Sequence, residues 1–393
     1  MRDVAIIAAG QTKFARTEWP LIDLLVEGAR TAYADNRIDE SLIEAVLVAN
    51  MGAGMLNHQS GVASAVVDGL GLMPAHAELI ENGPASGASA VKLAFLGIAS
   101  GYYDVVMVVG GEKMRAVTGW ESTDFVATLT HPFAEYVYGV TLPSMAALFA
   151  RLYMDKYGIT SEHLAMVAIK NHDNGMLNPE AHVQQPITMD GILHRPEAVV
   201  NNPIVAEPLR LFDCCPVSDG SAGIILCAAE RAKEFTDKPV IIAGVGQATD
   251  TLVVHEREDP TDLKAVTLAS EQAFKMAGAT PADVDVAELH DAFTILEIAE
   301  SEHAGLFPKG EGHKALERGD TRIGGKMPIN PSGGLKARGH PVGATGIAQL
   351  VELTKQLRGD AGERQIKNAK TAYACNFGGF GNNVLAFVLK KGQ

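Results

Sequence analysis

The sequence predicts an α/β fold built from two similar halves, and three observations support this prediction. Short apolar runs alternate with amphipathic stretches, which is the pattern of strand–helix–strand units around a buried sheet. Several short motifs recur in the same order in the second part of the chain. The length of 393 residues, at roughly 150 residues per domain, suits two or three domains or one fold with two similar halves.

The composition excludes several classes of protein. Forty glycines against 18 prolines, with 47% hydrophobic residues, fit an ordered α/β protein better than a disordered or collagen-like chain. The 33 basic and 47 acidic residues give a net charge of −14, which offers no global attraction for nucleic acid or for an anionic membrane. Any ligand that carries phosphates must therefore be met by local basic groups.

Targeting and metal-binding patterns are not found in the sequence. No run reaches the ~18 consecutive apolar residues of a transmembrane helix, and the first residues lack a signal-peptide pattern. The four cysteines are too few for a disulfide scaffold, and no two have the C-x-x-C spacing of a zinc or redox site. We therefore expect a cytoplasmic protein that binds neither membrane nor metal.

The first half of the chain alternates predicted strands and helices, in the rhythm of strand–helix–strand units. In chain order, we predict a strand at Val4–Ala8, a helix at Leu21–Ala34, a strand at Ile43–Ala49, a helix at Ser86–Ala99 and a strand at Asp104–Val109.

The second half repeats this pattern. VAIIAAGQ at residues 4–11 resembles VIIAGVGQ at residues 240–247. A small-residue pair before a helix and a Gly-Gly pair at a strand end then recur in the same order. These matches are Ser86-Gly87 with Thr345-Gly346, and Gly110-Gly111 with Gly378-Gly379. We therefore predict one half at residues 1–238 and the other at residues 239–393.

A less regular segment at about residues 114–210 interrupts the first half. It contains the pairs His131-Pro132, Asn178-Pro179, Gln185-Pro186, Arg195-Pro196 and Asn202-Pro203, and proline biases the preceding residue away from helix. We expect loops here, with one helix at Val140–Tyr157. A long insertion of this kind either shapes a binding site or is a surface excursion, and both can hold.

Four short stretches combine residues that carry chemistry with glycine. They are ENGPASGASA (81–90), ELHDAF (288–293), NPSGGLKARGHPVGATG (330–346) and CNFGGFG (375–381). The third presents His340 just before a helix, where backbone N–H groups favour anions. The fourth places Cys375 at a strand end, before free amides that could form an oxyanion hole. A thiol and an imidazole on adjacent loops suit acyl chemistry or proton abstraction.

Each of these residues also has a structural interpretation. A single histidine is often structural, a buried cysteine is often a small hydrophobe, and glycine turns often serve tight packing. Their shared position favours function, because each follows a strand or precedes a helix in a repeated unit. Ligands bind at that edge of open α/β sheets.

These motifs resemble those of the thiolase superfamily over nearly the whole chain. GGLKARGHPVGATG resembles the family stretch GGxxxxGHPxGxTG, CNFGGFG resembles CxGGGxG, and ELHDAF resembles the HDxF variant of the NEAF motif. With the stretch DCCPVSDGSAG, they are similar to the sterol-carrier-protein-x and archaeal branch. The resemblance implies two duplicated βαβ halves in a layered α-β-α-β-α architecture, coenzyme A as a substrate and no metal in this chain.

One departure from the family pattern concerns the nucleophile. Thiolases carry a nucleophilic cysteine in a stretch like ENxCxSG, and Pro84 occupies that position here. Proline has no nucleophile and no transferable proton, although it suits the first turn of a helix. The usual acyl-enzyme therefore cannot form at this position. Ser86 lies nearby, but the alignment gives it a structural place.

Several reactions remain compatible with this departure. The first is Claisen-type cleavage or formation of a β-ketoacyl-CoA, including an aromatic or branched one such as an aroylsuccinyl-CoA, with Cys375 as acyl carrier or as activator of free CoA. The second is retro-aldol cleavage of a β-hydroxyacyl-CoA, which needs no covalent intermediate. The chain could also transfer acyl groups within a multi-subunit complex, or serve as a non-catalytic CoA-binding scaffold. We favour the first because both His340 and Cys375 are retained.

The resemblance also assigns roles to single residues. His340 polarises the thioester or ketone oxygen, Cys375 moves the proton or attacks, and His290 orients a water or donates to a second oxyanion. We expect the imidazole of His340 and the sulfur of Cys375 to face one cavity beside Pro84. The predicted coenzyme A contacts are Gly339, Gly378, Gly379, Lys336 and Arg338, with Arg210 and Lys170 as further basic residues for the phosphates.

The resemblance further implies an assembly. Thiolases form homodimers through their central sheets, and members of the branch pair with a small OB-fold, zinc-ribbon protein that helps to bind CoA. We therefore expect a homodimer of this chain with two such partner subunits.

Overall fold

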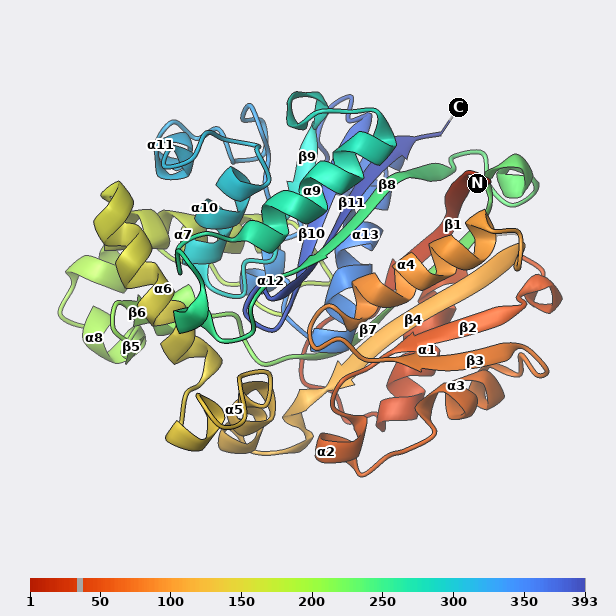
Figure 1. The fold of residues 1–393 in the computed structure, drawn as a ribbon, viewed down its shortest axis with the longest axis horizontal. Helices are drawn as coiled ribbons and strands as arrows, with labels where there is room; N and C mark the ends of the chain where they lie inside the picture. The colour runs from red at the N-terminus through yellow and green to blue at the C-terminus, as the bar shows by residue number, and fades with distance from the viewer. Residues whose placement is uncertain (34–37, 393) are drawn as a thin grey trace.

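The computed structural model describes residues 1–33 and 38–392, and within them nine strands form one mixed sheet (Figure 1). The first half contributes β1 (Val4–Gln11), β2 (Ala45–Ala49), β3 (His76–Ile80), β4 (Val105–Lys113) and β7 (Asp219–Ala228). The second half contributes β8 (Val240–Thr249), β9 (Val286–Glu288), β10 (Thr371–Gly378) and β11 (Asn383–Lys391). A separate hairpin joins β5 (Ile204–Ala206) to β6 (Leu209–Arg210).

The order of the strands shows the duplication. The sheet runs β3-β2-β4-β7-β1-β8-β11-β10-β9, so β9-β10-β11-β8 repeats the order β2-β4-β7-β1. The strand senses repeat as well, because the first pair of each set is parallel and the next two pairs are antiparallel. The two halves meet where β1 pairs antiparallel with β8, with Ala5 opposite Ile241. The fold is therefore two βαβ halves joined through their first strands.

Helices cover and separate the two parts of the sheet. The outer helices of the first half are α1 (Leu21–Tyr33) and α3 (Val62–Leu70), and α9 (Lys264–Ala277) and α10 (Thr294–His303) cover the outer face of the second half. The central helices α4 (Ser86–Ala99) and α13 (Val342–Arg358) share one apolar core with strands of both halves. This arrangement gives the layered α-β-α-β-α architecture.

The small residues at the starts of α4 and α13 allow these two helices to approach closely. A Cβ atom added to Gly87 would lie 2.8 Å from the carbonyl oxygen of Gly343. One added to Gly346 would lie 2.4 Å from the backbone nitrogen of Ala88. Such distances are shorter than real side-chain contacts, so glycine is required at both positions. The helix starts, and the loops that precede them, are thereby held side by side.

The predicted elements of the first half are confirmed with small shifts at their ends. β1 runs three residues beyond the predicted Ala8, β2 begins two residues after Ile43, and β4 continues through Lys113. Helix α4 has the predicted bounds. Helix α1 begins at Leu21 as predicted, and the predicted end at Ala34 lies outside the described residues.

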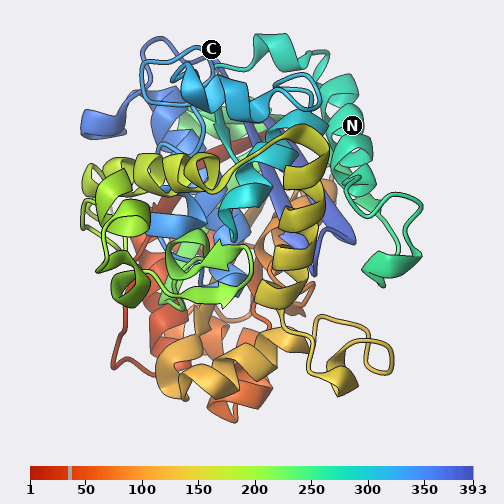
Figure 2. The ribbon, with the colours of Figure 1, turned by 90° about the vertical axis from the view of Figure 1, so that its left-hand side faces the viewer.

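The segment at residues 114–210 is more helical than the sequence predicts. Figure 1 shows α5 (Gly119–Ala127), α6 (Leu142–Tyr157), α7 (Ser161–Met176) and α8 (Ala198–Asn201) together on one side of the molecule, and Figure 2 turns that side toward the viewer. The helix predicted at Val140–Tyr157 is α6, whereas α7 was missed. The X-Pro pairs named above lie outside these helices, so they mark interruptions between helices rather than one long loop.

Three short helices complete the chain: α2 (Ala53–Asn57), α11 (Gly312–Glu317) and α12 (Gly334–Ala337). None of the helices in the described residues has the length and apolar character needed to cross a membrane.

Candidate active site

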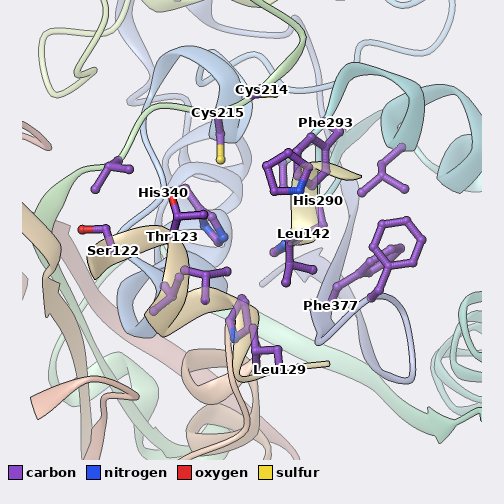
Figure 3. A pocket seen from close by; sticks show the side chains of 18 of the residues that line it. Ser122, Thr123, Leu129, Leu142, Cys214, Cys215, His290, Phe293, His340 and Phe377 are labelled. Atoms are coloured by element: carbon purple, nitrogen blue, oxygen red, sulfur yellow. The ribbon is translucent and has the colours of Figure 1, made fainter. Parts of the chain in front are cut away.

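A small cavity of about 140 Å³ lies where the two halves meet the helical insertion (Figure 3). Most of its wall is apolar, with two imidazoles and two thiols among the lining side chains. The chemically active lining residues are His290, His340, Cys214 and Cys215, and Pro84 forms another part of the wall. His290 follows β9, and His340 lies between α12 and α13. Both histidines are therefore at the ends of elements, as ligand-binding residues of α/β sheets commonly are.

The two imidazoles are in contact. The ring centroids of His290 and His340 are 5.0 Å apart, and the rings cross at 87°. Their side chains are buried, with 3% and 8% of the residue surface exposed. The two residues lie 50 positions apart in the sequence, and the meeting of β9 with the start of α13 brings them together.

The hydrogen bonds of His340 assign its tautomer. The Nδ1 atom lies 2.7 Å from the hydroxyl oxygen of Thr345, which donates its single hydrogen to the carbonyl oxygen of Pro341 at 2.9 Å. The hydroxyl oxygen therefore accepts from Nδ1–H of His340. The Nε2 atom of the neutral ring is left with a free lone pair, so His340 can accept a proton.

The hydrogen bonds of His290 assign the opposite tautomer. The side-chain amide of Asn376 donates to Nδ1 at 3.0 Å, which leaves the hydrogen of the neutral ring on Nε2. The ring of Phe377 stacks on His290 with centroids 5.3 Å apart at 7°. The backbone N–H of His290 donates to Glu300 at 2.9 Å. His290 is therefore fixed as a hydrogen-bond donor.

Burial keeps both rings neutral. It lowers the pKa of His340 to about 3, with a further contribution from the charge of Arg338. It lowers the pKa of His290 well below the usual value, and His340 and Arg338 add to this effect. A neutral donor and a neutral acceptor in contact can polarise a carbonyl oxygen and accept a proton at the same reaction centre.

Pro84 lines the cavity, in the turn that precedes α4. Ser86 carries the nearest hydroxyl group in the sequence that could replace the nucleophile, and it is fully buried. Its hydroxyl donates to the carbonyl oxygen of Gly83 at 2.6 Å and accepts from the backbone N–H of Asn82 at 2.8 Å. Ser86 therefore closes the turn and does not face the cavity.

Cys375 is not among the residues that line the cavity beside His340, where we expected its sulfur to lie. Cys375 is fully buried and belongs to the core between β10 and the outer helices. Burial raises the pKa of its thiol well above the usual value, and the neighbouring carboxyl of Glu300 adds to this rise. The side chain of Cys375 packs in that core, and β10 continues for three residues beyond it.

The three glycines predicted to contact coenzyme A have different surroundings. Gly379 lines the cavity, and its φ of 60° requires glycine. Gly339 has a φ of 109°, and a Cβ atom there would lie 2.7 Å from the hydroxyl oxygen of Ser218. Gly378 ends β10, where a Cβ atom would lie 3.0 Å from the carbonyl oxygen of Asn82. Gly339 and Gly378 therefore allow close packing beside the site.

Three of the basic residues predicted to contact the phosphates of coenzyme A are buried and so not available to a ligand. Arg338 is fully buried and pairs with Glu288 at 3.1 Å. Lys170 is 1% exposed and pairs with Glu297 at 2.8 Å. Lys336 is 4% exposed, and burial lowers its pKa. The GGLKARGHP loop is covered by the helical insertion, which explains why its cations are internal.

Arg210 is half-buried, and one of its guanidinium nitrogens donates to the carbonyl oxygen of Asn202 at 3.3 Å. It lies on β6 and is not among the residues that line the cavity beside the two histidines.

Other residues of the site were missed in the sequence. Figure 3 shows the sulfur of Cys215 directed into the cavity near His340. Burial raises the pKa of the Cys215 thiol to about 12, so it stays protonated at neutral pH. The DCCPVSDGSAG stretch contained this residue, but no pattern there indicated a cavity wall. Asn376 and Thr345 were within the matched motifs, and only the fold shows that they orient the two imidazoles.

A buried carboxylate holds the start of α13 in place. Glu112, at the end of β4, accepts hydrogen bonds from the backbone N–H groups of Gly343, Gly52 and Met51 and from the side chain of Asn50. The four distances lie between 2.7 and 3.1 Å. This carboxylate ties the central helix to the first half of the sheet, and so fixes the loop that bears His340.

No group of three or more His, Cys, Asp or Glu side chains in the described residues could hold a metal ion.

The sequence matches two family models over almost the whole chain. Residues 4–230 match the family described as "Thiolase, N-terminal domain", and residues 246–391 match "Thiolase C-terminal domain-like".

Curated relatives give the same result. An acetyl-CoA acetyltransferase of Methanothermobacter thermautotrophicus is 43% identical over the whole of both chains. Sterol carrier protein 2 of Bos taurus is 32% identical, covering 99% of this chain and 72% of that protein. The benzoylsuccinyl-CoA thiolase subunit BbsB of Thauera aromatica is 34% identical, covering 93% of this chain and 92% of that protein.

A solved structure agrees with these matches. The Ltp2-ChsH2(DUF35) aldolase superposes with a TM-score of 0.82 at 26% identity, covering 99% of this chain and 97% of that chain. The chain therefore belongs to the thiolase superfamily, in the branch that includes sterol carrier protein 2.

Proposed function

We propose that this protein is an acyl-CoA acyltransferase that cleaves or forms a carbon–carbon bond in a β-ketoacyl-CoA without an acyl-enzyme at position 84. The observation that carries this proposal is the pair of neutral imidazoles, His340 as acceptor and His290 as donor, in a cavity where Pro84 replaces the nucleophile. The acetyltransferase and thiolase relatives support an acyltransferase of this kind.

In the cleavage direction, the thiol of free coenzyme A gives its proton to Nε2 of His340 and its sulfur attacks the β-carbonyl carbon. The bond between the α- and β-carbons then breaks, and its electron pair forms the enolate of the departing acyl-CoA. The Nε2–H of His290 stabilises the enolate oxygen. The proton on His340 moves to the α-carbon, so two acyl-CoA products form and both imidazoles are restored.

The pKa values favour free coenzyme A over Cys215 as the attacking thiol. An ordinary free thiol has a pKa near ~8.5. Burial raises the pKa of Cys215 to about 12, so this thiol stays protonated at neutral pH. Cys215 therefore forms part of the wall against the reacting sulfur, and no sulfur on this chain has to become acylated.

The wall of the cavity suits an apolar acyl group. Phe293, Phe377 and Phe380 line it together with Leu129 and Leu142. Aromatic side chains pack well against aromatic and branched groups. The similarity to a benzoylsuccinyl-CoA thiolase subunit supports an aromatic substrate such as an aroylsuccinyl-CoA.

The test is a panel of β-ketoacyl-CoA thioesters, incubated with and without free coenzyme A and analysed for both acyl-CoA products. We expect cleavage that depends on coenzyme A, loss of cleavage in the His340→Ala variant, and no acyl adduct on any cysteine by mass spectrometry. An activity of the assembled complex that survives in His340→Ala would instead identify this chain as a scaffold.

A second function is retro-aldol cleavage of a β-hydroxyacyl-CoA, which is favoured by the similarity to the Ltp2-ChsH2(DUF35) aldolase. His340 would accept the proton of the β-hydroxyl group, and His290 would stabilise the same enolate. Release of an aldehyde or ketone without free coenzyme A would support this reaction. Strict dependence on coenzyme A would exclude it.

A homodimer is part of the proposal. β3 is an edge strand of the sheet, and His76, Glu78 and Leu79 are exposed on it. Leu93 and Leu96, on α4, are also exposed apolar side chains. An open edge beside apolar surface favours pairing with a second copy of the chain. The turn that contains Pro84 follows β3 directly, so this interface would support the site.

A small OB-fold, zinc-ribbon partner subunit is also proposed. The similar aldolase is named for two components, Ltp2 and ChsH2(DUF35). On this chain, α8 and the β5–β6 hairpin expose Val199, Val200, Ile204 and Val205. An exposed apolar group of this kind is typical of a binding surface for another protein.

A further inference from the structure

A second cavity adjoins the one that contains the two histidines. It has a volume of about 690 Å³ and is lined by residues of the α5 start, of the loop after β1 and of the insertion. Ser122, Pro216 and Val217 line both cavities. The inner cavity, at about 140 Å³, is too small for a whole coenzyme A thioester, whereas the outer one is within the ~300–1,000 Å³ of small-molecule sites.

Two arginines, Arg16 and Arg115, line the outer cavity. One buried carboxylate holds the backbone at Arg115 and next to Arg16. Asp219 is 1% exposed and accepts from the backbone N–H of Arg115 at 2.7 Å and from that of Thr17 at 3.1 Å. The chain at Arg115 and the chain beside Arg16 are therefore held at the same rim. In the described residues, no carboxylate lies within ion-pair distance of the Arg115 guanidinium. Arg16 pairs with the exposed Glu18 at 3.7 Å.

The remaining charges at this rim leave it positive. Arg115 and Lys13 both act on the nearby His182, whose pKa burial lowers, so that ring is neutral. The carboxylate of Glu121 also lines the cavity, but it accepts from the N–H and the hydroxyl of Thr118 at 2.8 Å each. Two arginines thus line a cavity of a chain whose net charge is −14.

We propose that the outer cavity binds the phosphorylated nucleotide end of the coenzyme A thioester, with Arg16 and Arg115 as its phosphate contacts. This inference rests on the proposed function and adds the location of the substrate's anionic end. Arginine matches the geometry of phosphate oxygens through paired N–H donors. The pantetheine arm then passes Ser122 and Val217 to reach His340, and the acyl group occupies the apolar inner wall.

The test compares coenzyme A with pantetheine, which has the same thiol arm and no phosphates, in titration calorimetry on the full chain. We expect the Arg16→Gln/Arg115→Gln double variant to bind coenzyme A about 20- to 100-fold more weakly, while its affinity for pantetheine is unchanged. The difference between the two proteins should shrink as salt is raised, because added ions screen exposed charges.

Arg322→Gln is the matched control. Arg322 is 50% exposed and pairs with Asp173 at 3.3 Å, and it is not among the lining residues of either cavity. Circular dichroism and thermal unfolding of each variant verify folding. If the double variant binds coenzyme A as tightly as the wild type does, the phosphate site is refuted while the proposed function stands. If the wild-type protein binds neither coenzyme A nor pantetheine, the proposed function itself fails.

Discussion

His290 and His340 meet edge to face, with ring centroids 5.0 Å apart, and their outer hydrogen bonds place the ring hydrogen on opposite nitrogens. Thr345 and Asn376 are the two residues that set this difference. The two imidazoles therefore have different roles in one cavity: His340 presents a lone pair, and His290 presents an N–H group.

The two histidines should respond differently to conservative substitution. Replacing either by alanine is expected to lower kcat/KM by about 100- to 1,000-fold, the usual effect of losing a general base or an oxyanion donor. His290→Gln keeps an N–H donor and should retain more activity than His290→Ala. His340→Gln offers no base and should be as slow as His340→Ala. Steady-state kinetics on the same acyl-CoA measure these differences. If glutamine restored the same share of activity at both positions, the assignment of the two tautomers would be wrong.

Cys375 is expected to matter for packing and little for catalysis. Its sulfur is fully buried between β10 and α10 and does not line the cavity. Cys375→Ala should change kcat by less than about threefold and lower the free energy of unfolding by about 1 kcal/mol. Denaturant unfolding and kinetics of the same preparation measure both quantities. If Cys375→Ala lost as much activity as His340→Ala, the sulfur of Cys375 would have to take part in catalysis.

The pH profile should show no step at the ordinary histidine pKa. Burial lowers the pKa of His340 to about 3, so its ring is neutral from about pH 5 upward, and burial lowers the pKa of His290 well below the usual value as well. We expect kcat/KM to stay constant as the pH is lowered past 6.5, because neither histidine titrates there. A limb near pH 6.5 that disappears in His340→Gln would show that the ring titrates normally.

The same groups give stability a defined pH dependence. The folded pKa of each ring lies below its unfolded value of about 6.5, so the unfolded chain binds more protons. The contribution of these groups is therefore fully present above pH 6.5 and is lost as the pH falls below 6.5, for His340 over the range down to about pH 3. Denaturant titrations of the wild type and of His340→Gln between pH 4 and 7 separate it from other groups.

Glu112→Gln should destabilise the fold more than its small change in shape suggests. Four donors converge on this carboxylate, and an amide would direct its own N–H groups at two of them. Leaving buried donors without acceptors costs about 2–3 kcal/mol. Urea unfolding measures the change. Glu121→Gln is a control, because this residue at the start of α5 is exposed and glutamine can replace glutamate in its capping role, so stability should change little.

Charge on the open edge should separate the proposed dimer. Leu79→Lys and Leu93→Lys place ammonium groups on β3 and on the exposed side of α4, where two copies would carry them into one interface. Sedimentation velocity should then show monomers where the wild type shows dimers. Leu148→Lys is the control, since Leu148 is 69% exposed on α6, away from this edge. A wild-type monomer would refute the proposal.

The sequence was sufficient for the repeated architecture because each half records its own local pattern. The runs at residues 4–11 and 240–247 became β1 and β8, and Ser86–Ala99 became α4 with unchanged bounds. Helix α7 was missed since its inward face includes Lys170, Asn171 and His172, which are polar residues that become buried only by pairing across the structure. Polar residues of this kind hide the apolar periodicity of a helix.

The sequence by itself determined the duplicated α/β fold, the position of His340 before the start of α13, and the lack of a nucleophile at Pro84. The tertiary structure decided which groups meet. In the folded chain, His290 contacts His340, and Cys375 is buried in the core beside the sheet. The side chain of Cys215 points into the cavity. The physical reason is that hydrophobic periodicity and helix signals act over a few residues. The depth of a side chain, by contrast, depends on how far a strand continues and on what an insertion covers.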